Sequence, residues 1–272
     1  MMKIAVLITC HNRRDTTMRC LRSLLPQLTV DDSLFIVDDG STDGTESAIK
    51  GLLYAASPMV KIISGDGSLF WAKGMNLAWN MAVTADCRYD FYLWLNDDVV
   101  LQNDAITGLT NDWKLTGDSF SVIVGACASD ETLKHSSYGA TNGSDERIIP
   151  NGVGPRSASG WFNGNVVLVP HRTFLSIGMI SPDYSHGKAD YDYAERLRRS
   201  GIPFYCSSRY VGYCSDVESR HLSNGCLYDR LKMLFRPGRY NLKDLLVFRK
   251  RYYGYGRAFI SALHLVYLVA KG

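Results

Sequence analysis

Polar side chains that could bind a metal ion and phosphate gather at four places in the first hundred residues. Each cluster directly follows an apolar run, and the four clusters are residues 9–12, 38–41, 64–67 and 96–98. Two of them contain adjacent acidic pairs, Asp38/Asp39 and Asp97/Asp98. Packed carboxylates repel each other unless a cation or hydrogen-bond donors neutralise them. A hard divalent ion held by one or two carboxylates and phosphate oxygens would do so, and the clusters predict such a site.

The apolar runs before these clusters predict strands that are buried on both faces, because they lack polar alternation. The runs are residues 3–9, 33–37, 60–63 and 91–95. Apolar residues at helical spacing lie between them, and alternating strands and helices predict parallel βαβ units. Ligands of an open parallel sheet bind beyond the carboxyl ends of its strands. We therefore expect the four clusters to meet at one edge.

The rest of the chain is less regular. It predicts helices and strands near residues 104–116, 121–126, 166–169, 171–177 and 190–200, with loops in 129–159. The expected fold class is α/β, with a Rossmann-type, mostly parallel sheet flanked by helices. Residues 1–225 are expected to form this domain, and residues 226–272 a basic, aromatic, helical C-terminal extension.

The first loop disfavours three other kinds of phosphate-binding protein. A dinucleotide-binding dehydrogenase would carry GxGxxG at the first βα turn, and a P-loop protein would carry its own glycine-rich signature. A sugar nucleotidyltransferase would also need a glycine-rich first loop. The turn here reads Thr9-Cys-His-Asn-Arg-Arg14 and contains no glycine.

Five motifs in order along residues 3–225 carry a resemblance to a known family. They are Thr9-Cys-His-Asn12, Val37-Asp-Asp-Gly-Ser-Thr-Asp-Gly-Thr45, Gly65-Asp-Gly-Ser-Leu-Phe-Trp-Ala-Lys-Gly-Met-Asn76, Trp94-Leu-Asn-Asp-Asp98, and Gly160-Trp-Phe-Asn-Gly164 leading to Asp190-Tyr-Asp192. Together they resemble the family 2 glycosyltransferases, which are nucleotide-sugar enzymes with the GT-A fold. The third motif is similar to the donor-binding segment of bacterial O-antigen and rhamnosyltransferase-like members.

The resemblance implies binding roles for the residues at matching positions. The nucleotide-sugar donor would be bound by Thr9, Asn12, Asp39, Trp71, Lys73, Asn76 and Asp97. Mg²⁺ or Mn²⁺ would be coordinated by Asp98, and His221 matches a late histidine that touches metal or diphosphate. One departure is Asn96, which stands at the first position of the family's DxD motif and keeps oxygen ligation at lower charge.

The resemblance also implies a catalytic base. Asp190 takes this role, and Asp192 could share or replace it because the acidic residue that usually precedes the base is Ala189 here. A carboxylate that accepts the proton of an acceptor hydroxyl, opposite a leaving diphosphate, produces a single displacement. A single displacement inverts the anomeric centre, as in inverting glycoside hydrolases. We therefore expect a metal-dependent, inverting transfer.

Some of these residues also have a purely structural interpretation. Asp38 could cap the helix expected after it, and Asp190 could cap its own helix. Trp71 could belong to the core, and His221 could be a solvated surface histidine. The sequence leaves these alternatives open.

Composition and charge indicate a folded chain with an unusual C-terminal part. Of 272 residues 46% are hydrophobic and 21% are charged, which excludes an intrinsically disordered chain. Residues 228–272 contain ten Lys or Arg and two Asp or Glu, a charge of +8, so the net +3 leaves −5 for the remainder. Aromatic residues are interleaved with these basic ones, as in Phe248-Arg-Lys-Arg-Tyr-Tyr-Gly-Tyr255.

Such a composition suits either a nucleic acid or a membrane surface. The resemblance implies the membrane, as a peripheral contact with the cytoplasmic face of the inner membrane, because many such enzymes extend polyprenol-linked glycans there. A helical pair packed on the domain or at a homodimer interface is the alternative, and a nucleic-acid partner is not expected. The seven cysteines lack paired spacing, and the longest apolar stretch, residues 258–270, is too short to span a bilayer. These features predict a cytoplasmic protein with free thiols.

The expected function is transfer of a sugar from a UDP- or dTDP-linked donor to a hydroxyl of a glycan or polyprenol-linked glycan. The resemblance places this step in bacterial surface polysaccharide synthesis. The alternative from a different class is a non-catalytic protein that binds nucleotide-sugars or glycans on the same scaffold.

Overall fold

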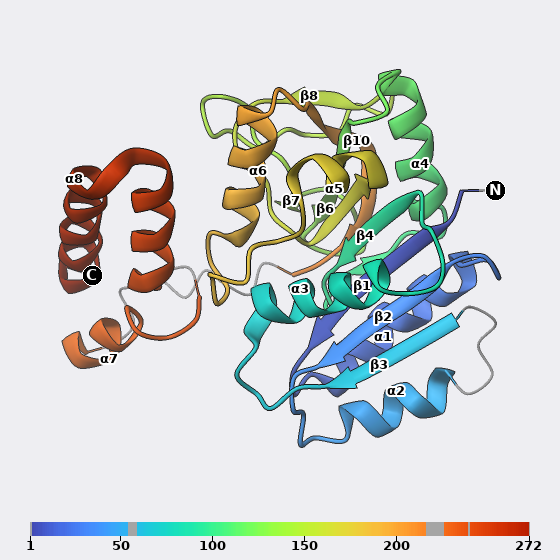
Figure 1. Ribbon diagram of the computed structural model, residues 1–272, viewed down its shortest axis with the longest axis horizontal. Coiled ribbons are helices and arrows are strands. Elements are labelled where there is room, and N and C mark those ends of the chain that lie inside the picture. The colour runs from blue at the N-terminus through green and yellow to red at the C-terminus, as the bar shows by residue number, and fades with distance from the viewer. Residues whose placement is uncertain (1, 54–58, 216–225, 239, 272) are drawn as a thin grey trace.

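The computed structural model describes residues 2–53, 59–215, 226–238 and 240–271. One mixed sheet lies between two layers of helices, and a helical arm stands at one side of this body (Figure 1). The strand order is β3-β2-β1-β4-β9-β6-β10-β5, with β7 beside β6 and β8 beside β10. This architecture confirms the predicted α/β class.

The first half of the sheet is parallel and lies where the apolar runs predicted it. It consists of β1 (Ile4–Cys10), β2 (Ser33–Asp38), β3 (Met59–Ser64) and β4 (Phe91–Leu95). Every residue of β1, β2 and β4 is buried, which explains why these runs show no polar alternation. In contrast β3 is the edge strand and is largely exposed.

The second half of the sheet mixes strand directions. β9 (Val166–Pro170) pairs antiparallel with β4, and β6 (Val122–Ala128) pairs antiparallel with β9. β10 (Phe204–Tyr213) then pairs parallel with β6, with irregular register between Cys206 and Gly212. Three short strands complete the sheet: β5 (Val100–Leu101), β7 (Ser136–Tyr138) and β8 (Arg156–Ala158).

Successive residues of each strand point to opposite faces of the sheet, and each face has its own core. Ile4, Val6 and Ile8 pack with α1 (Arg14–Leu24), α2 (Thr45–Leu53) and α4 (Ala105–Thr116). Ala5 and Leu7 pack with α3 (Phe70–Val83), α5 (His171–Ile177) and α6 (Ala189–Arg199). A 3₁₀ turn, η1 (Leu25–Gln27), follows α1.

Residues 226–271, which we call the C-terminal arm, comprise α7 (Leu227–Lys232) and α8 (Leu242–Lys271). At Gly254 the φ/ψ values of 80° and 172° break α8, and its two halves run in different directions (Figure 1). Phe248, before the break, is buried in the core that contains α6. No helix in the described part of the chain is long and apolar enough to cross a membrane.

Candidate active site

The four polar clusters meet at one edge of the sheet, as the predicted parallel order requires. Cys10 at the end of β1 pairs with Asp38 at the end of β2, and Asp38 pairs with Ser64 at the end of β3. β4 lies on the other side of β1 and ends at Leu95, directly before Asn96. The loops that follow these four strands therefore form a common surface.

Asp39 orders the loop that contains the third motif. It is 2% exposed, and both of its carboxylate oxygens accept backbone hydrogen bonds. Oδ1 accepts from Gly67 at 2.9 Å, and Oδ2 accepts from Leu69 at 3.0 Å and Phe70 at 2.8 Å. Gly65 lies against this carboxylate, because a Cβ there would be 2.6 Å from Oδ1. Asp39 thus holds the donor-segment loop, and its contact with a nucleotide stays a prediction.

Asp38 does not cap α2. Its Oδ1 accepts from the N–H of Ser41 at 3.0 Å, whereas α2 begins at Thr45 and the N–H of Thr45 donates to Asp43 at 3.0 Å. Asp38 is 1% exposed, and its Oδ2 is buried without a hydrogen-bond partner among the described residues. The capping interpretation of Asp38 is therefore not supported.

Asn12 joins the loops after β1 and β2. Its backbone is left-handed, with φ of 50°, a conformation that asparagine adopts more readily than most residues. Its N–H donates to Ser41 Oγ at 2.8 Å, and its Oδ1 accepts from the N–H of Thr42 at 2.7 Å. Asn12 itself remains exposed, so it holds the two loops together and is also accessible at the edge of the sheet.

Three further donor-binding candidates lie on α3 or beneath it. Thr9 is 8% exposed and lies under Gly74, where a Cβ would be 2.3 Å from the threonine Oγ1. Lys73 is half-buried in the first turn of α3. Asn76 donates its side-chain N–H to the carbonyl of Ile180 at 2.6 Å. The amide of Asn76 therefore ties α3 to the segment that precedes α6.

The acidic pair after β4 is bridged by Arg13, a residue that was not among the predicted site residues. Its Nη1 donates to Asp97 Oδ1 at 3.0 Å, and its Nη2 donates to Asp98 Oδ2 at 2.8 Å. Thr17 Oγ1 donates to the second oxygen of Asp97 at 3.1 Å. Burial raises the pKa of Asp97 to about 7, while the Arg13 guanidinium acts to lower it. Arg13 is thus the internal cation of this pair.

Asp98 offers an oxygen that could coordinate a divalent metal ion. Asp98 Oδ1 is buried and has no hydrogen-bond partner among the described residues. The thiol of Cys214 lies near the Asp98 carboxylate. The pKa of Cys214 is raised, first by burial and then by the charge of Asp98. A free carboxylate oxygen suits a hard cation that takes its other ligands from phosphates and water. The described residues hold no group of three or more His, Cys, Asp or Glu around one point. His221 lies outside the described residues.

Asn96 and Trp71 connect the acidic pair to the rest of the site. The indole Nε1 of Trp71 donates to Asn96 Oδ1 at 2.7 Å, so the amide at the first DxD position is engaged. Trp71 is only partly buried, and its ring lies edge-on to that of Trp94 at 6.4 Å. A Cβ on Gly164 would be 2.5 Å from two atoms of the Trp71 ring. The glycine of the fifth motif therefore allows this close approach.

Asp190 lies next to that contact. It stands in the first turn of α6, and its Oδ2 accepts from the N–H of Gly164 at 3.3 Å. Its Oδ1 accepts from the N–H of Tyr191 at 2.9 Å. Burial raises the pKa of Asp190, against the lowering effect of these N–H groups and of Lys188. A carboxylate with a raised pKa and only two long or local hydrogen bonds is suited to accept a proton.

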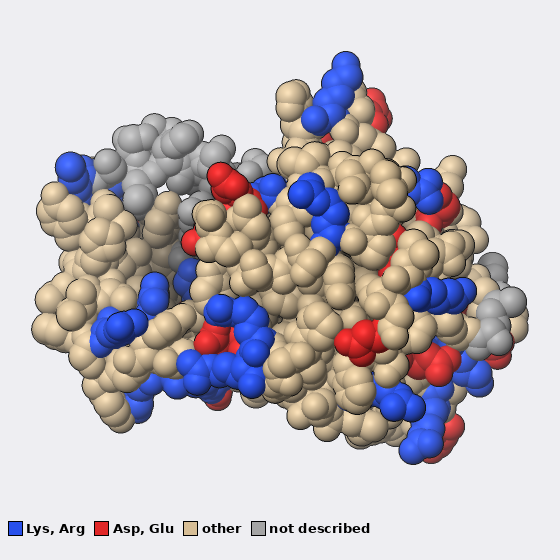
Figure 2. Space-filling view, turned by 90° about the horizontal axis from the view of Figure 1, so that it is seen from above, with Lys and Arg blue, Asp and Glu red and all other residues tan. Residues whose placement is uncertain are grey.

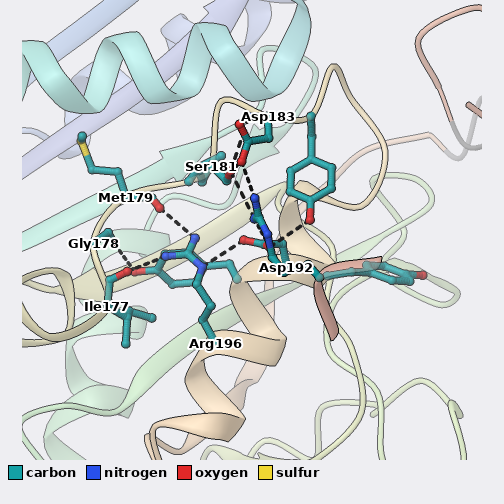
Figure 3. Close-up of polar contacts among 12 residues, drawn as sticks. Ile177, Gly178, Met179, Ser181, Asp183, Asp192 and Arg196 are labelled. Carbon is teal, nitrogen blue, oxygen red and sulfur yellow. Dashed lines mark hydrogen bonds and ion pairs between the residues drawn. The ribbon is translucent and has the colours of Figure 1, made fainter. Parts of the chain in front are cut away.

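Asp192 has a different environment (Figure 3). It is fully buried, and Oδ1 accepts hydrogen bonds from Tyr184 at 2.9 Å, Arg251 at 2.7 Å and Tyr252 at 2.7 Å. Oδ2 accepts from Arg196 at 2.9 Å. Each oxygen of Asp192 thus accepts from a guanidinium group, Oδ1 from Arg251 and Oδ2 from Arg196. No oxygen of Asp192 is left for an acceptor hydroxyl. This geometry favours Asp190 over Asp192 as the base.

Comparison with known proteins adds to this geometry. The family model described as glycosyl transferase family 2 matches residues 5–167, which is more than half of the chain. The chain belongs to glycosyl transferase family 2. The resemblance read from the five motifs is therefore confirmed, and the protein is a glycosyltransferase. No curated protein matches this glycosyltransferase in sequence.

Solved structures show the same fold. One is the mannosyltransferase PcManGT from Pyrobaculum calidifontis in complex with GDP-Man and Mn²⁺, with a TM-score of 0.61 and 15% identity, over 97% of this chain and 69% of that one. Another is TarS 1–349 from S. aureus in complex with UDP-GlcNAc, with a TM-score of 0.54 and 16% identity, over 93% of this chain and 73% of that one. These likenesses support the GT-A fold of the glycosyltransferase.

Proposed function

We propose that this glycosyltransferase moves a sugar from a nucleotide diphosphate-sugar to an acceptor hydroxyl with inversion, and that Asp190 is the base. The observation that carries the proposal is the contact of Trp71, Gly164 and Asp190. It joins a carboxylate of raised pKa to the loops that follow the first four strands. A base and a donor site must lie on one surface if transfer is to occur in one step.

In this mechanism Asp190 accepts the proton of the acceptor hydroxyl as its oxygen bonds to the anomeric carbon. The bond from that carbon to the nucleoside diphosphate breaks on the opposite face, so the configuration inverts. The two N–H groups of Gly164 and Tyr191 fix the carboxylate while it waits for the acceptor. Asp190 is partly buried, and its surroundings exclude part of the water that would compete as acceptor.

A divalent ion, Mg²⁺ or Mn²⁺, would be held by Asp98, and the residues present fit it because Asp98 Oδ1 has no hydrogen-bond partner in the part of the chain that the structure describes. When bound, the ion would neutralise the negative charge that grows on the leaving diphosphate. Arg13 already offsets part of the negative charge of Asp97 and Asp98 from the protein side. One of the solved structures of the same fold is described with Mn²⁺ and GDP-Man, which supports a metal-assisted reaction here.

The donor nucleotide is UDP or dTDP in this proposal, with the Asn12 and Asp39 loops on its nucleoside side and Lys73 near its sugar and diphosphate. A thermal-shift panel of UDP-, dTDP- and GDP-sugars with and without Mn²⁺ tests it, because a ligand of the native state raises its stability. NMR of the product then gives its anomeric configuration. No shift with any nucleotide-sugar would contradict the donor assignment, and a retained configuration would contradict the single displacement.

The acceptor is a glycan or polyprenol-linked glycan of bacterial surface polysaccharide in this proposal, and the arm is the part that meets the membrane. Between Leu245 and Gly272 the arm has five Lys or Arg and no Asp or Glu. Its second half carries apolar side chains that are 40% to 73% exposed: Tyr255, Phe259, Ile260, Leu263, Tyr267 and Leu268. Several are spaced by four residues, so they share one side of the helix.

Charge supports a lipid surface, and not a second copy of the chain, as the proposed partner of this stripe. Two arms of the same positive charge would repel each other, whereas anionic headgroups attract Lys and Arg. Aromatic side chains such as Tyr255 and Tyr267 suit the interface between headgroups and acyl chains. In Figure 2 the arm, at the left, shows blue basic side chains on a surface that is otherwise mostly tan. The proposal is therefore a peripheral contact with an anionic membrane on the cytoplasmic side.

A further inference from the structure

The first half of α8 is joined to the body of the enzyme through a buried carboxylate. Asp244 is 1% exposed and accepts hydrogen bonds from the turn formed by Ser185 and His186. The N–H of Ser185 donates to Oδ1 at 3.0 Å, its hydroxyl donates to Oδ2 at 2.9 Å, and the N–H of His186 donates to Oδ2 at 3.1 Å. A buried carboxylate with three donors from one turn fixes the conformation of that turn.

The same turn contacts the donor segment on its other side. The carbonyl of Ser185 accepts from the N–H of Ala72, in the first turn of α3, at 3.1 Å. The His186 ring lies edge-on to the Trp71 ring with 6.3 Å between their centres. Trp71 in turn donates to Asn96 at 2.7 Å. A continuous path of contacts therefore leads from the arm to the loop that holds the acidic pair.

A second path from the arm reaches the helix of the base. Arg251 and Tyr252 donate to Asp192 at 2.7 Å each, and Asp192 stands two residues after Asp190. Arg251 also forms an ion pair with Asp183. The segment from Asp183 to Asp192 is thus held by the arm at both ends and in the middle, and Asp190 lies within it.

We propose that Asp244 is a positioning residue for the transfer reaction. Asp244 fixes the Ser185–His186 turn, the turn fixes Trp71, and Trp71 and Gly164 set the place of Asp190 relative to the donor. This inference rests on the proposed function, because it assigns Asp190 as the base. It also means that the arm is part of the active site and not only a docking element.

The proposal is tested with the full-length variants Asp244→Asn and Asp244→Glu, and with Asp229→Asn as the control. Asn keeps the size of the side chain but presents N–H groups to donors of the turn, and Glu keeps the carboxylate. Asp229 is an exposed acid of the same arm, whose partner is the thiol of Cys226. Each variant is measured for kcat and KM of sugar transfer, for nucleotide binding by calorimetry, and for amide hydrogen exchange.

For Asp244→Asn we expect kcat to fall about tenfold or more, since small displacements of reacting groups are costly. Nucleotide affinity should stay within about twofold, because the side chains of Asn12 and Asp39 form their hydrogen bonds with loops of the body and not with the described residues of the arm. Hydrogen exchange should quicken at Ser185, His186 and Ala72 and remain unchanged in β1 and β2. Asp244→Glu should recover part of kcat, and Asp229→Asn should match the wild type.

Two results would overturn the proposal. One is an unchanged kcat in Asp244→Asn, and the other is a uniform rise of exchange with equal losses of kcat and nucleotide affinity, which indicates general destabilisation. If the wild-type enzyme binds no nucleotide, the proposed function fails instead. The exchange measurement then still decides whether Asp244 orders the turn, and normal exchange at Ser185 and His186 in the variant would refute that.

Discussion

The indole N–H of Trp71 donates to the side-chain oxygen of Asn96 at 2.7 Å, across 25 residues of sequence. This contact gives a structural reason for the amide at the first position of the DxD motif. The oxygen of Asn96 serves the tryptophan of the donor segment, and the carboxylates that follow it are left to pair with Arg13. The segment with the third motif, residues 65–76, is therefore joined by a hydrogen bond to the loop that carries the acidic pair.

Removing this hydrogen bond should impair transfer more than folding. Trp71→Phe keeps an aromatic residue on α3, but it loses the donor to Asn96 and the outer indole atoms that lie against Gly164. We expect kcat/KM to fall about tenfold, which corresponds to the ~1.4 kcal/mol of a hydrogen bond of ordinary strength. Thermal unfolding should shift little, because Trp71 is only partly buried. Full activity in this variant would contradict the positioning role of the indole.

A methyl group at Gly164 should disturb the same contact from the other side. Gly164→Ala would place a Cβ 2.5 Å from the Trp71 ring, so the ring or the loop must shift. We expect a loss of about 1–3 kcal/mol in the free energy of unfolding, as for other overpacked sites, and a marked loss of transfer. Chemical denaturation measures the first and a transfer assay the second.

The matched control is Gly108→Ala in α4, where a Cβ would meet nothing within 4 Å. That substitution should stabilise the enzyme by about 0.5–1 kcal/mol, because alanine is the better helix former. Equal effects of the two substitutions would show that the Trp71 contact is not special.

Asp190→Asn should abolish transfer while leaving nucleotide binding intact. In the wild type, kcat/KM should fall as pH decreases through the raised pKa of Asp190, because the base must be ionised. The folded protein holds the Asp190 proton more tightly than the unfolded chain, so ionisation of this residue lowers stability as pH rises. Asp190→Asn should therefore be at least as stable as the wild type at neutral pH. A clear destabilisation would favour a structural role for Asp190.

Arg13→Gln should make the acidic pair dependent on a divalent ion for stability. Without the guanidinium, Asp97 and Asp98 repel each other, and we expect a loss of about 1–2 kcal/mol in metal-free buffer, given that Arg13 is partly exposed. Mn²⁺ should then raise the melting temperature of the variant more than that of the wild type. Arg22→Gln, at an exposed arginine of α1, is the control and should show no such difference. Equal Mn²⁺ effects in all three proteins would contradict a metal ion at this pair.

Acidic substitutions in the exposed stripe of the arm should weaken vesicle binding without affecting nucleotide binding. The double variant Phe259→Glu/Ile260→Glu introduces two acids into the exposed stripe, and we expect affinity for anionic vesicles to fall about tenfold or more. Val30→Glu, an exposed apolar residue elsewhere in the body, should bind vesicles like the wild type. Cosedimentation at two salt concentrations measures both. Failure of the wild type to bind anionic vesicles at low salt would refute the membrane contact.

Much of the fold could be predicted from the sequence because its signals are local. Strands buried on both faces appear as unbroken apolar runs, and β1, β2 and β4 lie within one residue of the predicted ends. β10 was missed because it contains Ser207, Ser208 and Arg209 and pairs irregularly with β6. Its polar residues are tolerated where the ladder is interrupted, and no local pattern shows this in advance.

Candidate site residues were predicted from two signals, the strand ends and the motifs of the resemblance, and the second signal selected Trp71 and Asp190. Asp38, Asp39, Asp97 and Asp98 were found because parallel strands bring their carboxyl ends together. The pairing of Arg13 with Asp97 joins residues 84 apart, and two basic residues in the first loop were the available signal. The hydrogen bonds that occupy Asp192 Oδ1 come in part from Arg251 and Tyr252, which lie 59 and 60 residues away in the sequence. Such long-range contacts have no local pattern that could reveal them.

The hydrogen bond between Ser185 and Asp244 also has a consequence for the order in which parts of the enzyme fold. Ser185 leaves the ribosome 59 residues before Asp244 does, so the turn beside Trp71 is synthesised well before the carboxylate that fixes it. The sheet and its two cores can form during synthesis, since domains generally fold as units from the N-terminal side. The arrangement around Asp190 is then completed last, when α8 docks. A nascent chain that lacks α8 would be folded in its sheet but not yet an efficient enzyme.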